Sequence, residues 1–310
     1  MSQRLVVSTP GNALRNMVGD VPDGVEMIRW DMDGPAPVDH IDIAVGPYMG
    51  GPRPLANLET VTTQLVQSQS IGYDGVTKYL PSGRAFANAA SVHEASTAEL
   101  AMALILASQR GIPDFVRAAD QGTWSPARYA SLADRRVLIV GYGGIGAALE
   151  RRLEGFEASV TRVARTARDV TAGHVHGFDE LPVLLPEAEI VILSVPLNAE
   201  TTHLVDAAFL AALSDDALVV NVARGKVVDT EAMLVEARTG RLRFGLDVTE
   251  PEPLPEGHEL FSLPNVLIAP HVGGASTAML PRMAKLLRRQ IDHALAGEVF
   301  ENVVIAPEPR

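Results

Sequence analysis

The residue spacing with the clearest chemical meaning is Gly141-x-Gly143-x-x-Gly146, which directly follows the apolar run Val137–Val140. The first glycine permits a tight turn, the second lets the backbone approach a pyrophosphate, and the third lets a helix pack closely on the strand. A helix that begins here directs unpaired N–H groups and the positive end of its dipole at phosphates. No Gly-Lys-Ser/Thr follows, which excludes a P-loop. An ordinary glycine-rich turn is the alternative, but the context favours a dinucleotide site with contacts from Gly141, Gly143, Gly144, Ile145 and Gly146.

The segment after the next apolar run, Ser159–Val163, bears on which dinucleotide binds. An acid is expected at this place to hold the ribose hydroxyls of NAD, whereas an arginine can bind the 2′-phosphate of NADP. The chain has no acid there, and Ala164 is followed by Arg165, Thr166 and Arg168. Arg165 and Thr166 are therefore predicted cofactor contacts, and NADP is favoured with NAD possible. A solvated run of charge is the alternative.

Four polar segments come directly after predicted strands, at the carboxyl edge where open α/β sheets bind their ligands. They are Ser194-Val195-Pro196, Asn221-Val222-Ala223-Arg224-Gly225, the acidic stretch from Asp247 to Glu252, and Pro270-His271-Val272-Gly273-Gly274. Each alone could be an ordinary surface or loop segment. Together they would bring an arginine, acids and a histidine to the edge that carries the dinucleotide fingerprint, which favours an active site beside the nicotinamide.

The elements that must position these groups alternate along the chain. From Arg135 onward, apolar runs alternate with segments of helical length, which indicates a doubly wound, mostly parallel α/β sheet. The expected strands are Val137–Val140, Ser159–Val163, Ile190–Ser194, Leu218–Asn221, Arg243–Leu246 and Val266–Ala269. A helix is expected over Thr230–Thr239, and a long apolar helix over Ser96–Arg110 with Ser96 or Thr97 as its N-cap.

The first part of the chain predicts a second, smaller α/β domain. Its expected strands are Leu5–Val7, Val25–Ile28, Ile41–Val45 and Gln64–Ser68. A basic helix over Pro281–Leu295 is expected near the end of the chain. We place a substrate-binding domain at residues 1–95 and a dinucleotide-binding domain at 96–280.

Composition excludes several classes of protein. The 310 residues carry 38 acids against 26 bases, a net charge of −12, which argues against a nucleic-acid or anionic-membrane surface. There are no cysteines, so disulfides, cysteine-based metal sites and thiol nucleophiles are excluded. His174 and His176 form a His-x-His pair without a carboxylate at ligand spacing, so we expect a pair of loop residues and no metal site. No secretory signal is recognisable, and we expect a cytoplasmic protein.

With these motifs the chain resembles the D-isomer-specific 2-hydroxyacid dehydrogenases, the family of glyoxylate/hydroxypyruvate reductases and phosphoglycerate dehydrogenases. The most specific pieces are Val220–Gly225, Leu246–Pro253 and Pro270–Gly274, and the resemblance extends from Gln69–Asp74 to Gly297–Val303. It implies a Rossmann cofactor domain, a flavodoxin-like substrate domain that is discontinuous because residues 281–310 return to it, and a homodimer formed through the cofactor domains. It also implies cofactor contacts by Val195, Pro196, Val222, Ala223, Asp247 and Gly273.

By this resemblance Arg224, Glu252 and His271 are the catalytic set. We expect Arg224 to bind the substrate carboxylate and carbonyl oxygen, since its planar fork suits such groups. His271, charged and paired with Glu252, would give a proton to the carbonyl oxygen while the nicotinamide gives hydride to carbon.

The backbone N–H groups of Ser70, Ile71, Gly72 and Tyr73 would hold the substrate carboxylate. The expected substrate is a small 2-oxoacid, with glyoxylate or hydroxypyruvate first. The alternatives are a phosphoglycerate dehydrogenase-like activity and a non-catalytic, dinucleotide-sensing protein of the corepressor type.

Overall fold

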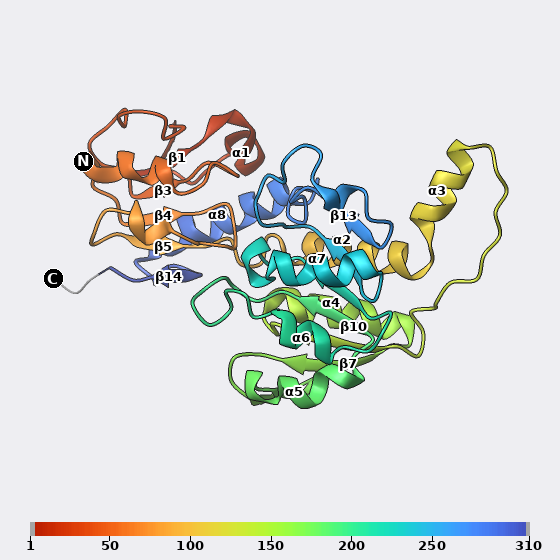
Figure 1. Ribbon diagram of the computed structural model, residues 1–310. Coiled ribbons are helices and arrows are strands. Elements are labelled where there is room, and N and C mark those ends of the chain that lie inside the picture. The colour runs from red at the N-terminus through yellow and green to blue at the C-terminus, as the bar shows by residue number, and fades with distance from the viewer. Residues whose placement is uncertain (1–3, 308–310) are drawn as a thin grey trace. The chain divides into compact units, whose positions relative to one another are not determined.

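The computed structural model describes residues 4–307, and its internal contacts divide the chain into two units (Figure 1). Unit 1 comprises Met1–His93 and Ser276–Arg310, and unit 2 comprises Glu94–Ala275. The assignment of these parts as a substrate domain and a cofactor domain, with the boundaries given above, stays a prediction.

Unit 1 is built on one sheet of six strands in the order β14-β5-β4-β3-β1-β2. The strands are β1 (Leu5–Thr9), β2 (Val25–Arg29), β3 (Ile43–Val45), β4 (Leu65–Gln67), β5 (Ala85–Ala87) and β14 (Val303–Ile305). All neighbours are parallel except β14, which runs antiparallel to β5. Without β14 the order is 2-1-3-4-5, the flavodoxin-like order.

Helices and 3₁₀ turns cover both faces of this sheet. One face packs against α1 (Gly11–Val18) and α8 (Met279–Ala296), whose Leu14, Met283 and Leu287 join a core with strand residues such as Val7. The other face packs against η1 (Arg53–Thr60) through Leu55 and Leu58. η2 (Val76–Lys78) completes the unit. The return of the terminal helix to the first part of the chain therefore supplies six of the sixteen buried residues of the core on this first face.

Unit 2 contains an eight-stranded sheet in the order β13-β12-β11-β10-β6-β7-β9-β8. Its strands are β6 (Arg136–Val140), β7 (Ser159–Val163), β8 (Arg168–Val170), β9 (Gly173–His176), β10 (Ile190–Leu193), β11 (Leu218–Asn221), β12 (Arg243–Leu246) and β13 (Val266–Ile268). Seven strands are parallel, and β8 pairs antiparallel with β9. The chain order reverses between β6 and β10, which is the switch point at which doubly wound sheets bind dinucleotides.

The helices of unit 2 form a layer on each face of the sheet. α2 (Glu94–Gln109) and α4 (Gly144–Leu153) share one core, while α5 (Leu181–Leu184), α6 (Ala207–Ala212) and α7 (Thr230–Thr239) contribute to the other. Short 3₁₀ turns connect them: η3 (Glu154–Phe156), η4 (Phe178–Glu180), η5 (Leu185–Glu187), η6 (Gly225–Val227) and η7 (Glu259–Phe261).

Three local predictions were wrong. α2 begins at Glu94, so Ser96 and Thr97 are buried inside the helix and neither is its N-cap. The β8–β9 hairpin was not expected, because only Val175 in it is fully buried and no apolar run marks it. His174 and His176 consequently lie in strand β9, not in a loop.

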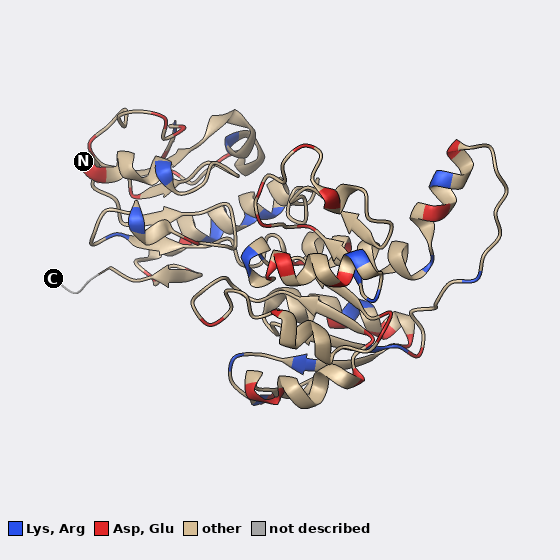
Figure 2. Ribbon diagram, viewed as in Figure 1, with Lys and Arg blue, Asp and Glu red and all other residues tan. Residues whose placement is uncertain are grey.

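α3 (Ile112–Asp120) and the chain that follows it extend away from the sheet of unit 2, as the yellow segment of Figure 1 shows. Acidic and basic residues alternate along α3 (Figure 2), where Asp114, Arg117 and Asp120 are three residues apart. Within residues 4–307, none of the helices combines the length and the apolar character needed to cross a membrane.

Candidate active site and cofactor-binding site

The glycine loop after β6 is shaped by close backbone contacts. Gly141 has a φ of +109°, and a Cβ there would lie 2.5 Å from the carbonyl carbon of Ser194. A Cβ at Gly146 would lie 2.5 Å from the Gly141 oxygen, whereas nothing is within 4 Å of one at Gly143. The first and third glycines therefore pack the turn against β10 and α4, and the second leaves the surface of the turn open for a pyrophosphate.

The start of α4 is available to an anion. Gly143 precedes the helix and has no side chain to cap its first turn, and the Glu94 carboxylate lies beside Gly144, where a Cβ would be 3.1 Å from Glu94 Oε1. The first N–H groups of a helix have no partner inside it, so Gly144, Ile145 and Gly146 can donate to a phosphate without losing another bond. The local backbone thus fits the predicted dinucleotide.

The end of β7 carries positive charge and no acid. Ala164 donates its N–H to the His176 oxygen (2.9 Å), which fixes the start of this segment. Arg165 is exposed, and it forms no hydrogen bond or ion pair with the other described residues. Arg168 instead donates from Nη2 to the Tyr142 oxygen (2.7 Å) and so braces the glycine loop. Of the two arginines, Arg165 is therefore the one whose side chain remains open to an incoming anion.

Arg224, Glu252 and His271 follow three neighbouring strands, β11, β12 and β13. His271 and Glu252 form a hydrogen-bonded ion pair between Nδ1 and Oε1, and both side chains are about 40% exposed. The bond from Glu252 raises the pKa of His271, and the pKa of Glu252 is lowered mainly by the same bond. The Arg224 charge lowers the pKa values of both groups, so it lies close to the pair. The pair therefore favours a charged imidazolium whose Nε2 is left for a substrate.

Asp247 holds the backbone that carries His271. It is 3% exposed, and its two carboxylate oxygens accept the N–H groups of Val272 (2.7 Å) and Gly273 (3.0 Å). The Asp247 carbonyl oxygen accepts the His271 N–H (2.7 Å), which stabilises the left-handed φ of +53° at His271. Burial raises the pKa of Asp247, opposed by these backbone bonds. Asp247 is therefore a positioning residue for the histidine loop.

The turn that carries Arg224 is fixed in a similar way. Asn221 accepts the Ala223 N–H and donates from Nδ2 to the Arg224 oxygen, both at 3.0 Å. Gly225 packs against the β12 loop, where a Cβ would lie 1.9 Å from the Thr249 oxygen. No role was expected for Asn221, although an asparagine that ends a strand before a turn is the signal that could have indicated one.

The remaining predicted cofactor contacts lie around these turns. Val195, Val222 and Ala223 are buried, and the N–H groups of Val222 and Ala223 donate to the Leu193 oxygen and to Asn221 Oδ1. Pro196 accepts the Thr201 hydroxyl through its carbonyl oxygen (2.6 Å). Glu250 is not part of the histidine pair, because its partners are His203 (3.2 Å) and Lys226 (3.9 Å).

The loop of unit 1 predicted to bind a carboxylate exposes peptide N–H groups. The Ser70 N–H already donates to Ser68 Oγ (3.0 Å), whereas Asn88 anchors the loop by donating from Nδ2 to the Ile71 oxygen (3.0 Å). Among the described residues, the N–H groups of Ile71, Gly72 and Tyr73 have no acceptor. The N–H groups of these three residues remain available for an anion, whereas the Ser70 N–H is already bonded.

Known proteins share this arrangement. The NAD-binding domain of D-isomer specific 2-hydroxyacid dehydrogenases matches residues 102–273. The glyoxylate reductase of Thermococcus onnurineus (strain NA1) is 36% identical over 254 residues, 78% of this chain and 76% of that protein.

Solved structures agree. A D-isomer specific 2-hydroxyacid dehydrogenase from Xanthobacter autotrophicus Py2, in complex with NADPH and MES, matches with a TM-score of 0.81 at 27% identity over 98% of each chain. An NADPH-dependent glyoxylate/hydroxypyruvate reductase from Sinorhizobium meliloti, in complex with NADP and malonate, matches with a TM-score of 0.77 at 27% identity over 97% of this chain and 96% of that one. With its site geometry and these relatives, the chain belongs to the D-isomer specific 2-hydroxyacid dehydrogenase family of NAD(P)-dependent enzymes.

Proposed function

We propose that this dehydrogenase reduces small 2-oxoacids, with glyoxylate or hydroxypyruvate as substrate and NADPH as hydride donor. The single observation that carries the proposal is the hydrogen-bonded His271–Glu252 pair, in which Glu252 raises the pKa of His271, beside Arg224 at the carboxyl edge of a sheet with an open glycine turn. A proton donor and a carboxylate-binding cation at that edge are what reduction of a 2-oxoacid requires.

His271 donates the proton in this reaction. Its Nδ1 is held by Glu252, so Nε2 is the atom that faces the carbonyl oxygen of the substrate. The bound cofactor supplies the hydride to the carbonyl carbon. As the oxygen gains negative charge, the proton moves from Nε2 to it, and Glu252 stabilises the charged ring until that moment.

Arg224 orients the substrate. Its guanidinium presents several N–H donors in a fixed plane, which suits a carboxylate and an adjacent carbonyl oxygen. One of them, on Nη1, donates to the Ala223 oxygen (2.7 Å), which fixes the plane of the group. We also assign the N–H groups of Ile71, Gly72 and Tyr73 to the substrate carboxylate.

NADPH is proposed over NADH because of Arg165. The position that would hold an acid is Ala164, and the exposed Arg165 lacks a partner among the described residues. The relatives from Xanthobacter autotrophicus Py2 and Sinorhizobium meliloti were solved with NADPH and NADP, respectively.

A substrate panel tests the proposal. The purified enzyme is given NADPH with glyoxylate, hydroxypyruvate, 3-phosphohydroxypyruvate or a branched 2-oxoacid, and the loss of cofactor absorbance is followed. We expect the highest kcat/KM for glyoxylate or hydroxypyruvate. A higher value for 3-phosphohydroxypyruvate would favour a phosphoglycerate dehydrogenase-like function, and no turnover of any 2-oxoacid would favour a dinucleotide sensor.

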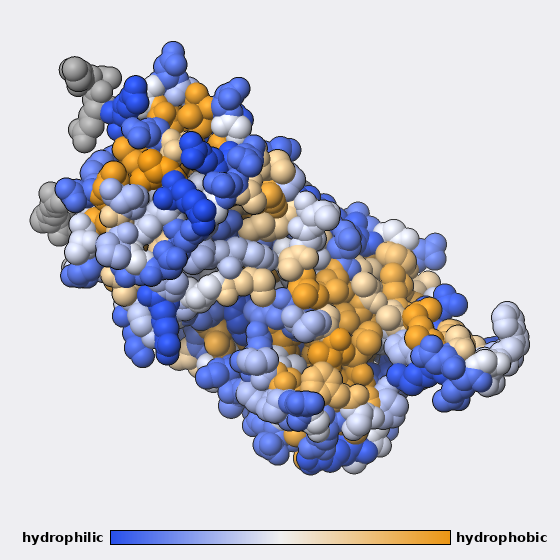
Figure 3. All heavy atoms as spheres, turned by 90° about the horizontal axis from the view of Figure 1, so that it is seen from above, coloured by the Kyte–Doolittle hydropathy of each residue, from blue (hydrophilic) through white to orange (hydrophobic). Residues whose placement is uncertain are grey.

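We further propose a homodimer formed through unit 2. α3 buries none of its residues within the described chain, Val116 on it is 54% exposed, and Trp124 beyond it is 94% exposed. Figure 3 shows hydrophobic residues gathered beside the base of this protruding segment. A second copy of the chain would cover these side chains. Light scattering should give twice the chain mass for the wild type and the chain mass for a V116E/W124A variant, whereas a monomeric wild type would contradict the assembly.

A further inference from the structure

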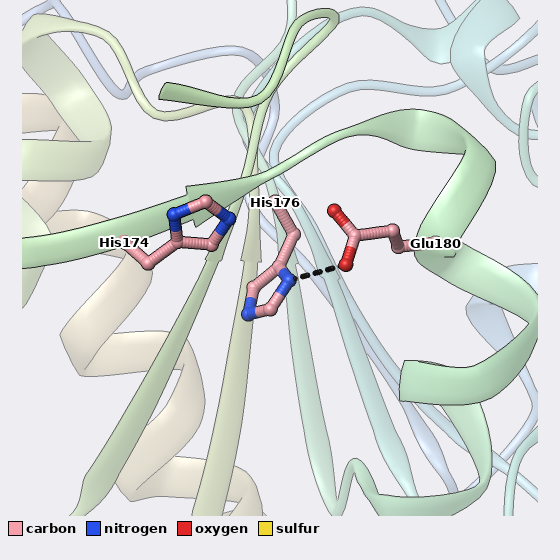
Figure 4. A group of neighbouring side chains, drawn as sticks. All are labelled: His174, His176 and Glu180. Atoms are coloured by element: carbon pink, nitrogen blue, oxygen red, sulfur yellow. Dashed lines mark hydrogen bonds and ion pairs between the residues drawn. The ribbon is translucent and has the colours of Figure 1, made fainter. Parts of the chain in front are cut away.

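The β8–β9 hairpin of unit 2 brings together two imidazoles and a carboxylate. His174 and His176 are two residues apart on β9 and therefore project on the same face of the strand. Their ring centroids are 4.8 Å apart and nearly perpendicular, and Glu180 on η4 faces them (Figure 4). One donor atom from each of the three residues lies within 4.8 Å of the others.

Each of these side chains is already oriented by a second bond. Asp169, opposite His174 in the hairpin, contacts His174 Nδ1 at 2.8 Å, which leaves the Nε2 of this ring for a ligand. Glu180 contacts His176 Nδ1 with Oε2 (2.8 Å) and accepts the Gly177 N–H with Oε1 (2.9 Å). The Asp169 carboxylate behind His174 fixes this ring and raises its basicity, as carboxylates do behind metal-bound histidines.

We propose that His174, His176 and Glu180 bind a divalent transition-metal ion of the Zn²⁺ type, with Asp169 orienting His174. Two imidazoles and one carboxylate form a ligand set typical of zinc, whereas calcium and magnesium require oxygen ligands. The three side chains are 50%, 29% and 37% exposed, so an ion can enter and a water can complete the coordination.

The site needs only a small adjustment to close on an ion. Ligand atoms around a tetrahedral zinc lie about 3.4 Å apart, whereas His176 Nδ1 and Glu180 Oε2 are 2.8 Å apart and the donor atoms of all three residues lie within 4.8 Å of one another. The half-exposed His174 ring has room to turn inward on its χ angles. The sequence-based expectation of no metal site did not take Glu180 into account, which lies four residues after His176 and contacts its ring.

This site is distinct from the catalytic histidine. His271 follows β13, and five strands separate β13 from β9 in the sheet. With neighbouring strands about 4.8 Å apart, the two histidine sites lie roughly 29 Å from each other. Loss of the ion and loss of catalysis can therefore be measured separately.

The test is a Zn²⁺ titration of the full chain, dialysed against a chelator, in competition with a chromophoric zinc indicator. We expect one ion per chain, an affinity weakened at least about tenfold in His174→Ala and in Glu180→Gln, and a smaller loss of similar order in Asp169→Asn. The double variant H174A/H176A should retain no binding at this stoichiometry. His293→Ala is the matched control, because His293 also contacts two carboxylates, Glu298 (2.9 Å) and Glu301 (3.4 Å), and it should bind as the wild type does.

A second measurement distinguishes loss of the metal site from loss of the fold. Co²⁺ bound to the wild type should give visible absorption bands that are lost in Glu180→Gln, a nearly isosteric change, while the circular dichroism of the metal-free proteins stays the same. Absence of a saturable one-to-one site in the wild type would overturn the proposal. Unchanged zinc affinity in the folded double variant would do so as well.

Discussion

Two histidine–glutamate pairs in unit 2 share the same bond and differ in their surroundings. In both, a glutamate oxygen contacts Nδ1 of the ring. Glu252 is 19 residues from His271, on the loop after another strand, whereas Glu180 is four residues from His176. The first pair has an arginine and a buried aspartate as its neighbours, and the second has another histidine. The chemistry of each histidine–glutamate pair therefore depends on the side chains that lie beside it.

Arg224 and Asp247 make the first pair suitable for proton donation by His271. The carboxylates of Glu252 and Asp247 raise the pKa of His271, with the Glu252 hydrogen bond as the largest cause. Arg224 limits that rise and offers a place for an anionic substrate. A second imidazole in the other pair contributes another lone pair, which suits a metal ion. These differences can be tested by removing one group at a time.

The largest effect is expected from His271→Ala. Loss of a general acid lowers kcat by about 10² to 10⁴-fold. The change should appear in kcat for glyoxylate with saturating NADPH, while the affinity for NADPH, measured by fluorescence, stays close to that of the wild type. His176→Ala, measured alongside, should keep its kcat. A wild-type rate in His271→Ala would remove this histidine from the mechanism.

Glu252→Gln should shift the pH profile of reduction. Because the Glu252 bond raises the pKa of His271, its removal lowers that pKa. Reduction uses the protonated ring, so kcat/KM falls as the pH rises through the His271 pKa, and this fall should begin at lower pH in the variant. If the pKa of His271 falls by one unit, the protonated fraction of His271 at alkaline pH falls about tenfold.

Glu180→Gln is the matched control for this shift, because it breaks the other histidine–glutamate pair. Its pH profile should overlay that of the wild type. An unshifted alkaline limb in Glu252→Gln would show that Glu252 does not set the charge of His271.

Arg165→Ala should alter the choice of cofactor. A charge-assisted bond to a 2′-phosphate is worth about 1.5–3 kcal/mol before screening, so loss of one arginine should reduce the NADPH-over-NADH ratio of kcat/KM by about tenfold. NADH use should be unchanged. Arg151, exposed near the end of α4, provides an alanine control of equal charge change. Equal or better use of NADH by the wild type would contradict the preference.

The sequence predicted those parts of the site that depend on short-range pattern. The apolar runs that became β6, β10 and β11 are buried in full or nearly so, and the first and third glycines of the turn, Gly141 and Gly146, are required because a Cβ there would lie 2.5 Å from backbone atoms. The polar segments after the strands were predictable because parallel strands end at the same edge. Their roles were assigned by resemblance, not by spacing.

Other features of unit 2 depended on contacts that no pattern encodes. β8 and β9 contain one fully buried side chain, Val175, so hydrophobic periodicity could not reveal them. Glu150 on α4 is buried because it pairs with Arg162 on β7 and accepts the Tyr142 hydroxyl. This cluster ties the glycine loop to the helix and the strand, and only the folded chain brings its three members together.

The smallest effect is expected from Glu250→Gln. This variant tests whether another acid of the Asp247–Glu252 segment also raises the pKa of His271. Glu250 contacts His203 (3.2 Å) and Lys226 (3.9 Å), and their side chains are 47% and 61% exposed. Exposed pairs of this kind contribute about 0–1 kcal/mol to stability. The variant should therefore keep the wild-type kcat and the wild-type pH profile, and lose at most a small part of its thermal stability in a melting experiment. A shifted alkaline limb in Glu250→Gln would mean that the charge of His271 is shared between two glutamates, and the contrast between the two histidine pairs would then rest on Arg224 and Asp247 alone.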